Sequence, residues 1–188
     1  MEKLKYFANG IFYSKLSYCL AVFGNVFGLQ QYKDGQTKYV NYTTRDNNKL
    51  QVLQNRLNRI LTRSKLRTPT EDLLNMTHSL SVQQMIAQQT LVMIYKILQI
   101  SKPAYLANKI KYDTNQHNLR TKGRSLKRAN CKLNQSKEGF VNRAILLFNK
   151  LDEDVRNCES LDQFKQRAKI WVKKNVQIKP IRNQEAKT

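Results

Sequence analysis

Apolar residues recur every three or four positions along most of the chain, which is the spacing of one face of an α-helix. The pattern predicts one or two helices over residues 2–29, with Gly10 as a possible break, and another helix over residues 48–64. The polar stretch between them, residues 32–48, is typical of a loop, with a short strand around residues 38–42. On the helix at 48–64 we expect a buried face formed by Leu50, Leu53, Leu57, Ile60 and Leu61.

Three of the later helices begin at capping sequences, in which a serine or threonine precedes a glutamate or glutamine by three positions. The first, with Thr68 as the N-cap and a proline at the first helical position, predicts a short helix to about residue 75. Ser81 opens a helix to about residue 99, which is apolar on most sides and is expected to lie at the centre of the core. Ser160 caps the last helix.

Two further helices are expected over residues 104–110 and 138–150, separated by a long loop over residues 113–137. The chain holds only 6 glycines and 3 prolines, too few for the many turns of a β-sandwich or barrel. The sequence therefore predicts a mainly α fold, an irregular helical domain of about five to seven helices with a long basic loop. We expect four segments: an N-terminal apolar helical segment at 1–32, a polar linker at 33–48, a helical domain at 49–178 with a basic arm at 111–137, and a frayed tail at 179–188.

The charge of the chain points to the class of its partner. There are 34 lysines and arginines against 13 aspartates and glutamates, a formal net charge of +21. Such an excess favours a polyanion, either nucleic-acid phosphates or an anionic membrane face. The membrane is the weaker alternative, because the longest apolar stretch, residues 16–29, is shorter than the ~20 residues that span a bilayer. The helix at 48–64 also fits a membrane-surface helix only loosely, so we expect no membrane partner.

Positive charge is least balanced in and just before the arm, since residues 102–137 hold ten lysines and arginines against Asp113 alone. A segment of this composition contacts phosphates by charge and by hydroxyl hydrogen bonds, although a solvated loop or a nuclear-targeting stretch has the same composition. Trp171 on the last helix is expected to pack in the core rather than stack on a base. The expected phosphate contacts are Lys49, Arg56, Arg59, Arg63, Arg120, Lys122, Arg124, Lys127, Arg128, Lys173 and Lys174.

The sequence carries no recognisable catalytic or metal-binding pattern. His78 and His117 stand in no nucleophile or metal-ligand motif, and no glycine-rich phosphate loop occurs. The acidic run at 152–154 is interpreted as neutralising basic charge at a helix junction rather than holding a metal. The 3 cysteines have no paired spacing, which predicts neither disulfides nor zinc and favours an intracellular protein, nuclear or cytoplasmic. We expect no enzymatic activity within this chain and no cofactor.

Several short segments occur together in one order. They are YSKLSY at 13–18 with VFGN at 22–25, LQNR at 53–56 with RI at 59–60, YK at 95–96 with PAYL at 103–106, LRT at 119–121, LFNKL at 147–151 with VRN at 155–157, and SLDQFK at 160–165. Over residues 6 to about 176 the chain thereby resembles the region after the catalytic palm in reverse transcriptases of non-LTR (LINE-type, jockey-like) retrotransposons. It departs from that pattern at Phe23 and Phe148, where the family usually has tryptophan, and at Asp152, where it has proline.

The resemblance implies a role and a limit to that role. In this family the region after the palm is thought to help hold template RNA and target DNA, and its first helical segment would be thumb-like. The magnesium-binding aspartate pair of the parent RNA-directed DNA polymerase has no counterpart in this sequence, as in a fragment or a decayed copy. The resemblance implies a non-catalytic portion whose partners are an RNA or DNA backbone and upstream polymerase domains.

A second hypothesis belongs to a different class. It is a helical protein-interaction or structural module without nucleic-acid affinity, whose apolar first helix packs on upstream domains or on another copy of the chain.

Overall fold

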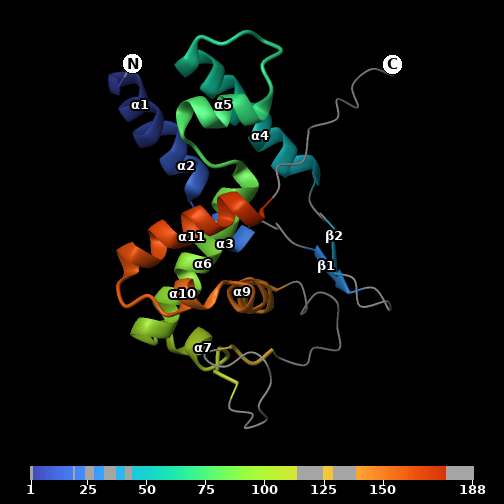
Figure 1. The fold of residues 1–188 in the computed structure, drawn as a ribbon, viewed down its shortest axis with the longest axis vertical. Coiled ribbons are helices and arrows are strands. Elements are labelled where there is room, and N and C mark those ends of the chain that lie inside the picture. The colour runs from blue at the N-terminus through green and yellow to red at the C-terminus, as the bar shows by residue number, and fades with distance from the viewer. Residues whose placement is uncertain are drawn as a thin grey trace.

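The structure is a computed structural model that describes residues 2–18, 20–23, 28–31, 37–40, 44–113, 125–128 and 139–176. In this part the chain is mainly helical, as the sequence predicts, and the helices pack around the long helix α6 (Figure 1). The elements are α1 (Glu2–Phe7), η1 (Ala8–Tyr13), α2 (Ser14–Ser17), α3 (Leu20–Phe23), β1 (Gly28–Gln31), β2 (Thr37–Val40), α4 (Thr44–Thr62), α5 (Thr70–Thr77), α6 (Val82–Ile100), α7 (Ala104–Ala107), α9 (Phe140–Asn149), α10 (Glu153–Arg156) and α11 (Leu161–Asn175).

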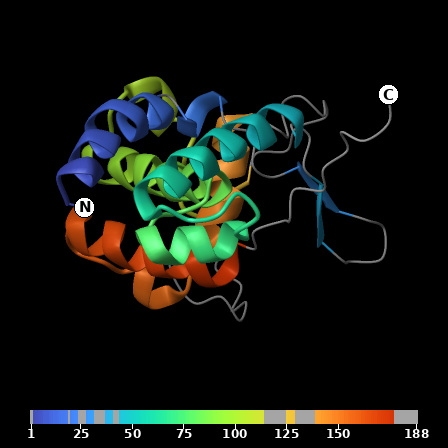
Figure 2. The same cartoon turned by 90° about the horizontal axis from the view of Figure 1, so that it is seen from above.

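The N-terminal segment is helical from α1 through α2, and Gly10 does not interrupt it because it lies inside the π-helical turn η1. The helix predicted over residues 2–29 is wrong at its end. Residues 28–31 instead form β1, whose backbone pairs antiparallel with β2, with Gly28 opposite Val40. The strand predicted around residues 38–42 is confirmed as β2, and the two paired strands lie to one side of the helices in both views (Figure 1 and Figure 2).

Hydrogen bonds confirm the predicted caps of the two longest C-terminal helices. At α6 the Gln84 N–H donates to Ser81 Oγ (3.2 Å), while the Ser81 N–H donates to Gln84 Oε1 (3.1 Å), which completes a capping box. At α11 the Gln163 N–H donates to Ser160 Oγ (3.3 Å). Both helices therefore begin where the serine satisfies one of their unpaired N–H groups.

The predicted start of α5 is wrong by one residue. Pro69 is the N-cap, since its carbonyl accepts the first helical bond, from the Leu73 N–H (3.2 Å). Thr68 instead donates its hydroxyl to the Lys65 carbonyl (2.8 Å) within the preceding loop. Boundaries also differ elsewhere: α4 begins at Thr44 rather than at residue 48, and α7 ends at Ala107 rather than at residue 110.

The central position predicted for α6 is confirmed, because it packs against α11, α9, α3 and α4. Its Tyr95 ring stacks on Phe164 of α11, with ring centroids 4.1 Å apart, and the Tyr95 hydroxyl donates to the Cys158 carbonyl (2.6 Å). Trp171 is buried in the same apolar cluster, which confirms its expected packing. The main core therefore lies between α6, α9 and α11.

The buried face of α4 agrees only in part with the one that the leucine pattern predicts. Leu61 is buried and Leu50 and Leu57 are half-buried, but Leu53 and Ile60 are 46% and 66% exposed. Four amide side chains turn inward instead: Gln51, Gln54, Asn55 and Asn58. They recur at intervals of three and four residues, so they fit one face of a helix just as closely as the leucines fit another. Periodicity alone could not choose between these two faces.

Hydrogen bonds allow the amides of α4 to be buried. The Gln54 side chain donates to the Leu80 carbonyl (2.6 Å), just before α6. The Gln51 Oε1 accepts from the Val82 N–H (2.9 Å), and its Nε2 donates to Gln54 Oε1 (2.8 Å) and to Asn55 Oδ1 (3.0 Å). A buried amide with partners avoids the desolvation penalty that an unpaired one would carry.

The same network reaches the N-terminal segment. Tyr13 of η1 donates its hydroxyl to Asn58 Oδ1 (3.1 Å), and Asn58 Nδ2 donates to Ser79 Oγ (3.5 Å) in the loop between α5 and α6. Asn55 Nδ2 donates to Thr70 Oγ1 (2.9 Å) at the start of α5. We call the Gln51, Gln54, Asn55 and Asn58 side chains with these partners the amide network.

Part of the predicted basic arm is fixed to the core. Leu126 is buried, and the Asn149 side chain of α9 accepts from its N–H (2.8 Å) and donates to its carbonyl (2.9 Å). Leu126 also forms an isolated antiparallel bridge with Tyr112. The remainder of the long loop predicted over residues 113–137, apart from residues 113 and 125–128, lies outside the described residues, as does the tail predicted at 179–188.

Across the described ranges, no helix combines the length and the apolar character needed to cross a bilayer.

Candidate nucleic-acid interface

The outward face of α4 carries cations and apolar side chains in alternation. Lys49, Leu53, Arg56, Ile60 and Arg63 are all exposed, and they follow one another at intervals of three or four residues. We call these five residues the α4 strip. With a rise of 1.5 Å per residue it is about 20 Å long, over which one strand of a duplex presents about six phosphates at ~3.4 Å each.

In the part of the chain that the structure describes, neither arginine of the α4 strip pairs with a carboxylate, unlike Lys165, which pairs with Asp162 (3.0 Å). Arg63 follows the last residue of α4 in a left-handed conformation (φ 52°), and the Ser64 N–H closes the helix by donating to the Arg59 carbonyl (3.2 Å). A cation at this position also faces the partial negative charge of the helix C-terminus. Arg56 and Arg63 therefore present guanidinium groups that no neighbouring carboxylate neutralises.

Arg59 departs from the predicted set of phosphate contacts. It is half-buried, and its Nη2 donates to the Thr68 carbonyl (3.4 Å), on the loop that joins α4 to α5. Its Nε is buried without a partner. Its position on the side of α4, between the exposed and buried faces, turns the guanidinium against this loop instead of toward solvent.

Two cations of α11 have partners within the protein. Lys165 pairs with Asp162, and Arg167 donates to the Asp154 carbonyl (2.8 Å). The predicted contacts Lys173 and Lys174 are exposed in the last turn. Their positive charges interact favourably with the negative end of the helix dipole, and their side chains remain exposed to solvent.

The arm contributes three described cations, of which Lys111 is exposed just before Tyr112. Lys127 and Arg128 are exposed and follow the buried Leu126 directly, so the core fixes the point at which they leave it. The predicted contacts Arg120, Lys122 and Arg124 lie outside the described residues.

The acidic run at 152–154 lies at a helix start, with Asp152 as the N-cap of α10 and the next two carboxylates in its first turn. In the described part of the chain, no group of three or more His, Cys, Asp or Glu side chains is placed to hold a metal ion. Carboxylates at a helix N-terminus are stabilised by the helix dipole.

Comparison with known proteins adds no relative, because no family model, no curated protein and no solved structure matches the chain.

Sequence reasoning missed two features of the structure. It did not place Leu53 and Ile60 among the cations, because it assigned them to the core. It also did not find a pocket beside Tyr13, His78 and Lys169, whose walls come from segments far apart in the sequence. No local sequence pattern could reveal it.

Proposed function

We propose that this chain is a non-catalytic, helical C-terminal portion of a retrotransposon reverse transcriptase, which holds template RNA or target DNA by contacts to phosphates. The observation that carries the binding role is the α4 strip, in which Arg56 and Arg63 are exposed on one line without an acidic partner among the described residues. The origin in a retroelement rests on the sequence resemblance alone.

The opposite face of α4 supports the binding role. The amide network fixes α4 to the loop before α6, to α5 and to η1, so the rotation of the helix about its axis is set by directional bonds. Because the helix itself is held in one rotation, the cations of the α4 strip face one direction without a further cost of ordering the backbone. The backbone contacts made by such a face would give affinity without sequence specificity.

Salt dependence tests this function directly. We expect binding of a 20-nucleotide RNA, or of a 20-base-pair DNA, to weaken steeply with salt in a filter-binding titration. For about six neutralised phosphates, the log–log slope should be about −4 to −5, from a release of roughly 0.7 to 0.9 counterions per phosphate. A flat response would contradict phosphate binding.

The exposed apolar side chains favour a second candidate function, a protein-interaction module. Tyr6, Phe7 and Tyr18 on the N-terminal segment are 77%, 67% and 81% exposed, and Leu66 after α4 is 85% exposed. Exposed apolar groups of this size are typical of surfaces that another protein covers. This function predicts concentration-dependent self-association in sedimentation velocity and no measurable RNA affinity at physiological salt. A monomer that binds RNA would contradict it.

A further inference from the structure

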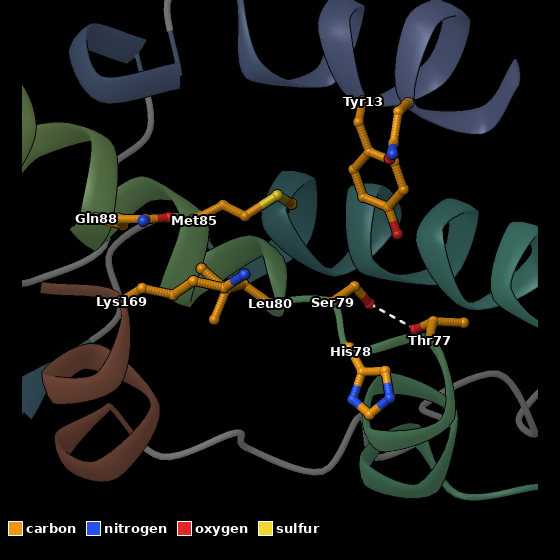
Figure 3. Close-up of a pocket in the computed structure, with 9 residues that line it drawn as sticks. Tyr13, Thr77, His78, Ser79, Leu80, Met85, Gln88 and Lys169 are labelled. Atoms are coloured by element: carbon orange, nitrogen blue, oxygen red, sulfur yellow. Dashed lines mark hydrogen bonds between the residues drawn. The ribbon is translucent and has the colours of Figure 1, made fainter. Parts of the chain in front are cut away.

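A pocket opens between three parts of the chain that are distant in sequence. Its walls come from η1, from the loop between α5 and α6 together with the first turns of α6, and from α11 (Figure 3). Its volume is about 340 Å³. This lies at the small end of the range for ligand pockets, about 300–1,000 Å³.

The lining of the pocket suits an anionic ligand that also has an apolar face. Nine residues line it, and none of them carries a carboxylate: Asn9, Tyr13, Thr77, His78, Ser79, Leu80, Met85, Gln88 and Lys169. The ammonium of Lys169 supplies the formal charge, and amides and hydroxyls supply polar atoms around it. Leu80 and Met85 supply the apolar part, and a thioether makes favourable contacts with flat rings.

Two opposite walls of the pocket are joined by hydrogen bonds. Asn58 of α4 accepts from Tyr13 and donates to Ser79, so one amide holds both η1 and the loop before α6. Ser79 Oγ lies 2.7 Å from Thr77 Oγ1, which itself donates to the Leu73 carbonyl (2.7 Å). These walls are therefore set before a ligand arrives, which lowers the entropic cost of binding.

Lys169 is the adaptable group of the pocket. It is exposed on α11, and its side chain extends from that helix toward Leu80, across from Tyr13 (Figure 3). A lysine ammonium on a flexible stem can follow a phosphate over several positions, since it acts as a point charge with three donors. The ligand should therefore bear its phosphate at the Lys169 side and its ring system against Leu80 and Met85.

We propose that this pocket receives one unpaired nucleotide of the bound strand. The inference rests on the proposed function, because it assumes that the chain binds a nucleic acid. A base inside a duplex would have to leave its stack to enter, at a cost of a few kcal/mol. The pocket therefore makes the protein prefer a single strand to a duplex of the same length.

The first test compares two lysine variants of the full chain. Lys169→Gln removes the cation of the pocket, and Lys173→Gln removes an equal charge one turn later on α11, outside the pocket. Both should weaken binding to a 20-base-pair duplex to a similar extent. The preference for a single strand should fall about tenfold in Lys169→Gln alone, which corresponds to the loss of one hydrogen bond to a charged group.

The second test observes the pocket directly. The chain has 2 histidines, so the ring resonances of His78 can be identified by their loss in His78→Asn. Adenosine 5′-monophosphate should shift them saturably in the natural chain and not in Lys169→Gln. Adenosine and inorganic phosphate, added separately, should each give weaker shifts because each fills half of the site.

The outcomes separate this inference from the proposed function. Steep, salt-dependent binding in which both lysine variants keep the same preference for a single strand, together with no His78 shift, would overturn the pocket and leave the function standing. If the chain binds neither the single strand nor the duplex, the proposed function is overturned, and with it the claim that a nucleotide of the bound strand enters the pocket. A pocket-specific loss in Lys169→Gln together with the His78 shift would support both.

Discussion

The two sides of α6 are held by different kinds of interaction. Toward α9 and α11 it contributes to a continuous apolar cluster that includes Phe148, Phe164 and Trp171. On the other side, the loop that leads into it meets α4 through the amides of Gln51 and Gln54. A small apolar cluster around Ile86 also lies outside the main core.

This difference separates stability from orientation. Apolar contacts are strong in sum but weakly directional. They therefore favour a compact packing of the helices without selecting one rotation of each helix about its axis. Buried amides carry a large penalty when their partners are missing, so they admit few arrangements. In this protein the apolar side should dominate the free energy of unfolding, while the amide side determines which face of α4 meets solvent.

The largest loss of stability is expected on the apolar side. Phe164 is fully buried and stacks on Tyr95, so Phe164→Ala should lower the free energy of unfolding by about 3–5 kcal/mol in urea denaturation. Ile170 lies on the same helix and is 69% exposed, so Ile170→Ala is the control and should stay within about 0.5 kcal/mol of the natural chain. Equal effects at both positions would contradict the packing of α11.

An intermediate loss is expected on the amide side. Gln54→Leu should cost about 1–3 kcal/mol, because it leaves the Leu80 carbonyl without its donor inside the protein. The neighbouring Leu53→Gln should change stability by no more than about 0.5 kcal/mol, because Leu53 faces solvent. The leucine pattern alone predicts the reverse order, so urea denaturation of this pair decides which face of α4 is buried.

A smaller loss is expected at the start of α6. Ser81→Ala removes one half of the capping box and should cost about 1 kcal/mol, whereas Ser81→Thr keeps the acceptor and should cost less. Thermal unfolding followed by circular dichroism measures both variants. A loss above that of Gln54→Leu would contradict the expectation that the amide network contributes more to stability than this cap.

These contrasts show what the sequence could predict and what it could not. Two local signals succeeded and one missed by a residue: the caps at Ser81 and Ser160 located two helix starts, because a cap depends on residues three positions apart, whereas the similar sequence at Thr68 did not cap α5. The prediction of the buried face of α4 failed for Leu53 and Ile60. The partners of the buried amides come from η1 and from the loop before α6, and only the fold brings these segments close to α4.

The residues of the candidate nucleic-acid interface also divide into those that the sequence predicts and those that it does not. Lys49, Arg56 and Arg63 are exposed, as their spacing on one line predicts. The inward turn of Arg59 and the anchoring of the arm at Leu126 were not predicted, because both depend on contacts with other segments. Leu126 is a single apolar residue in a basic stretch and carries no periodicity of its own.

The smallest effect on stability is expected for the exposed cations, where the effect on binding should be large. Arg56→Gln with Arg63→Gln leaves the amide network intact, so the free energy of unfolding should remain within about 1 kcal/mol of the natural chain. A matched control is Lys96→Gln with Lys109→Gln, which removes two exposed cations away from α4.

The most direct measurement of the central claim, that the α4 strip contacts phosphates, is the log–log salt slope of RNA binding for these two double variants. Loss of two phosphate contacts at roughly 0.7 to 0.9 each should make the slope of the arginine variant shallower by about 1.5, while the lysine control keeps the slope of the natural chain. An unchanged slope in the arginine variant, or an equal change in the control, would contradict the claim.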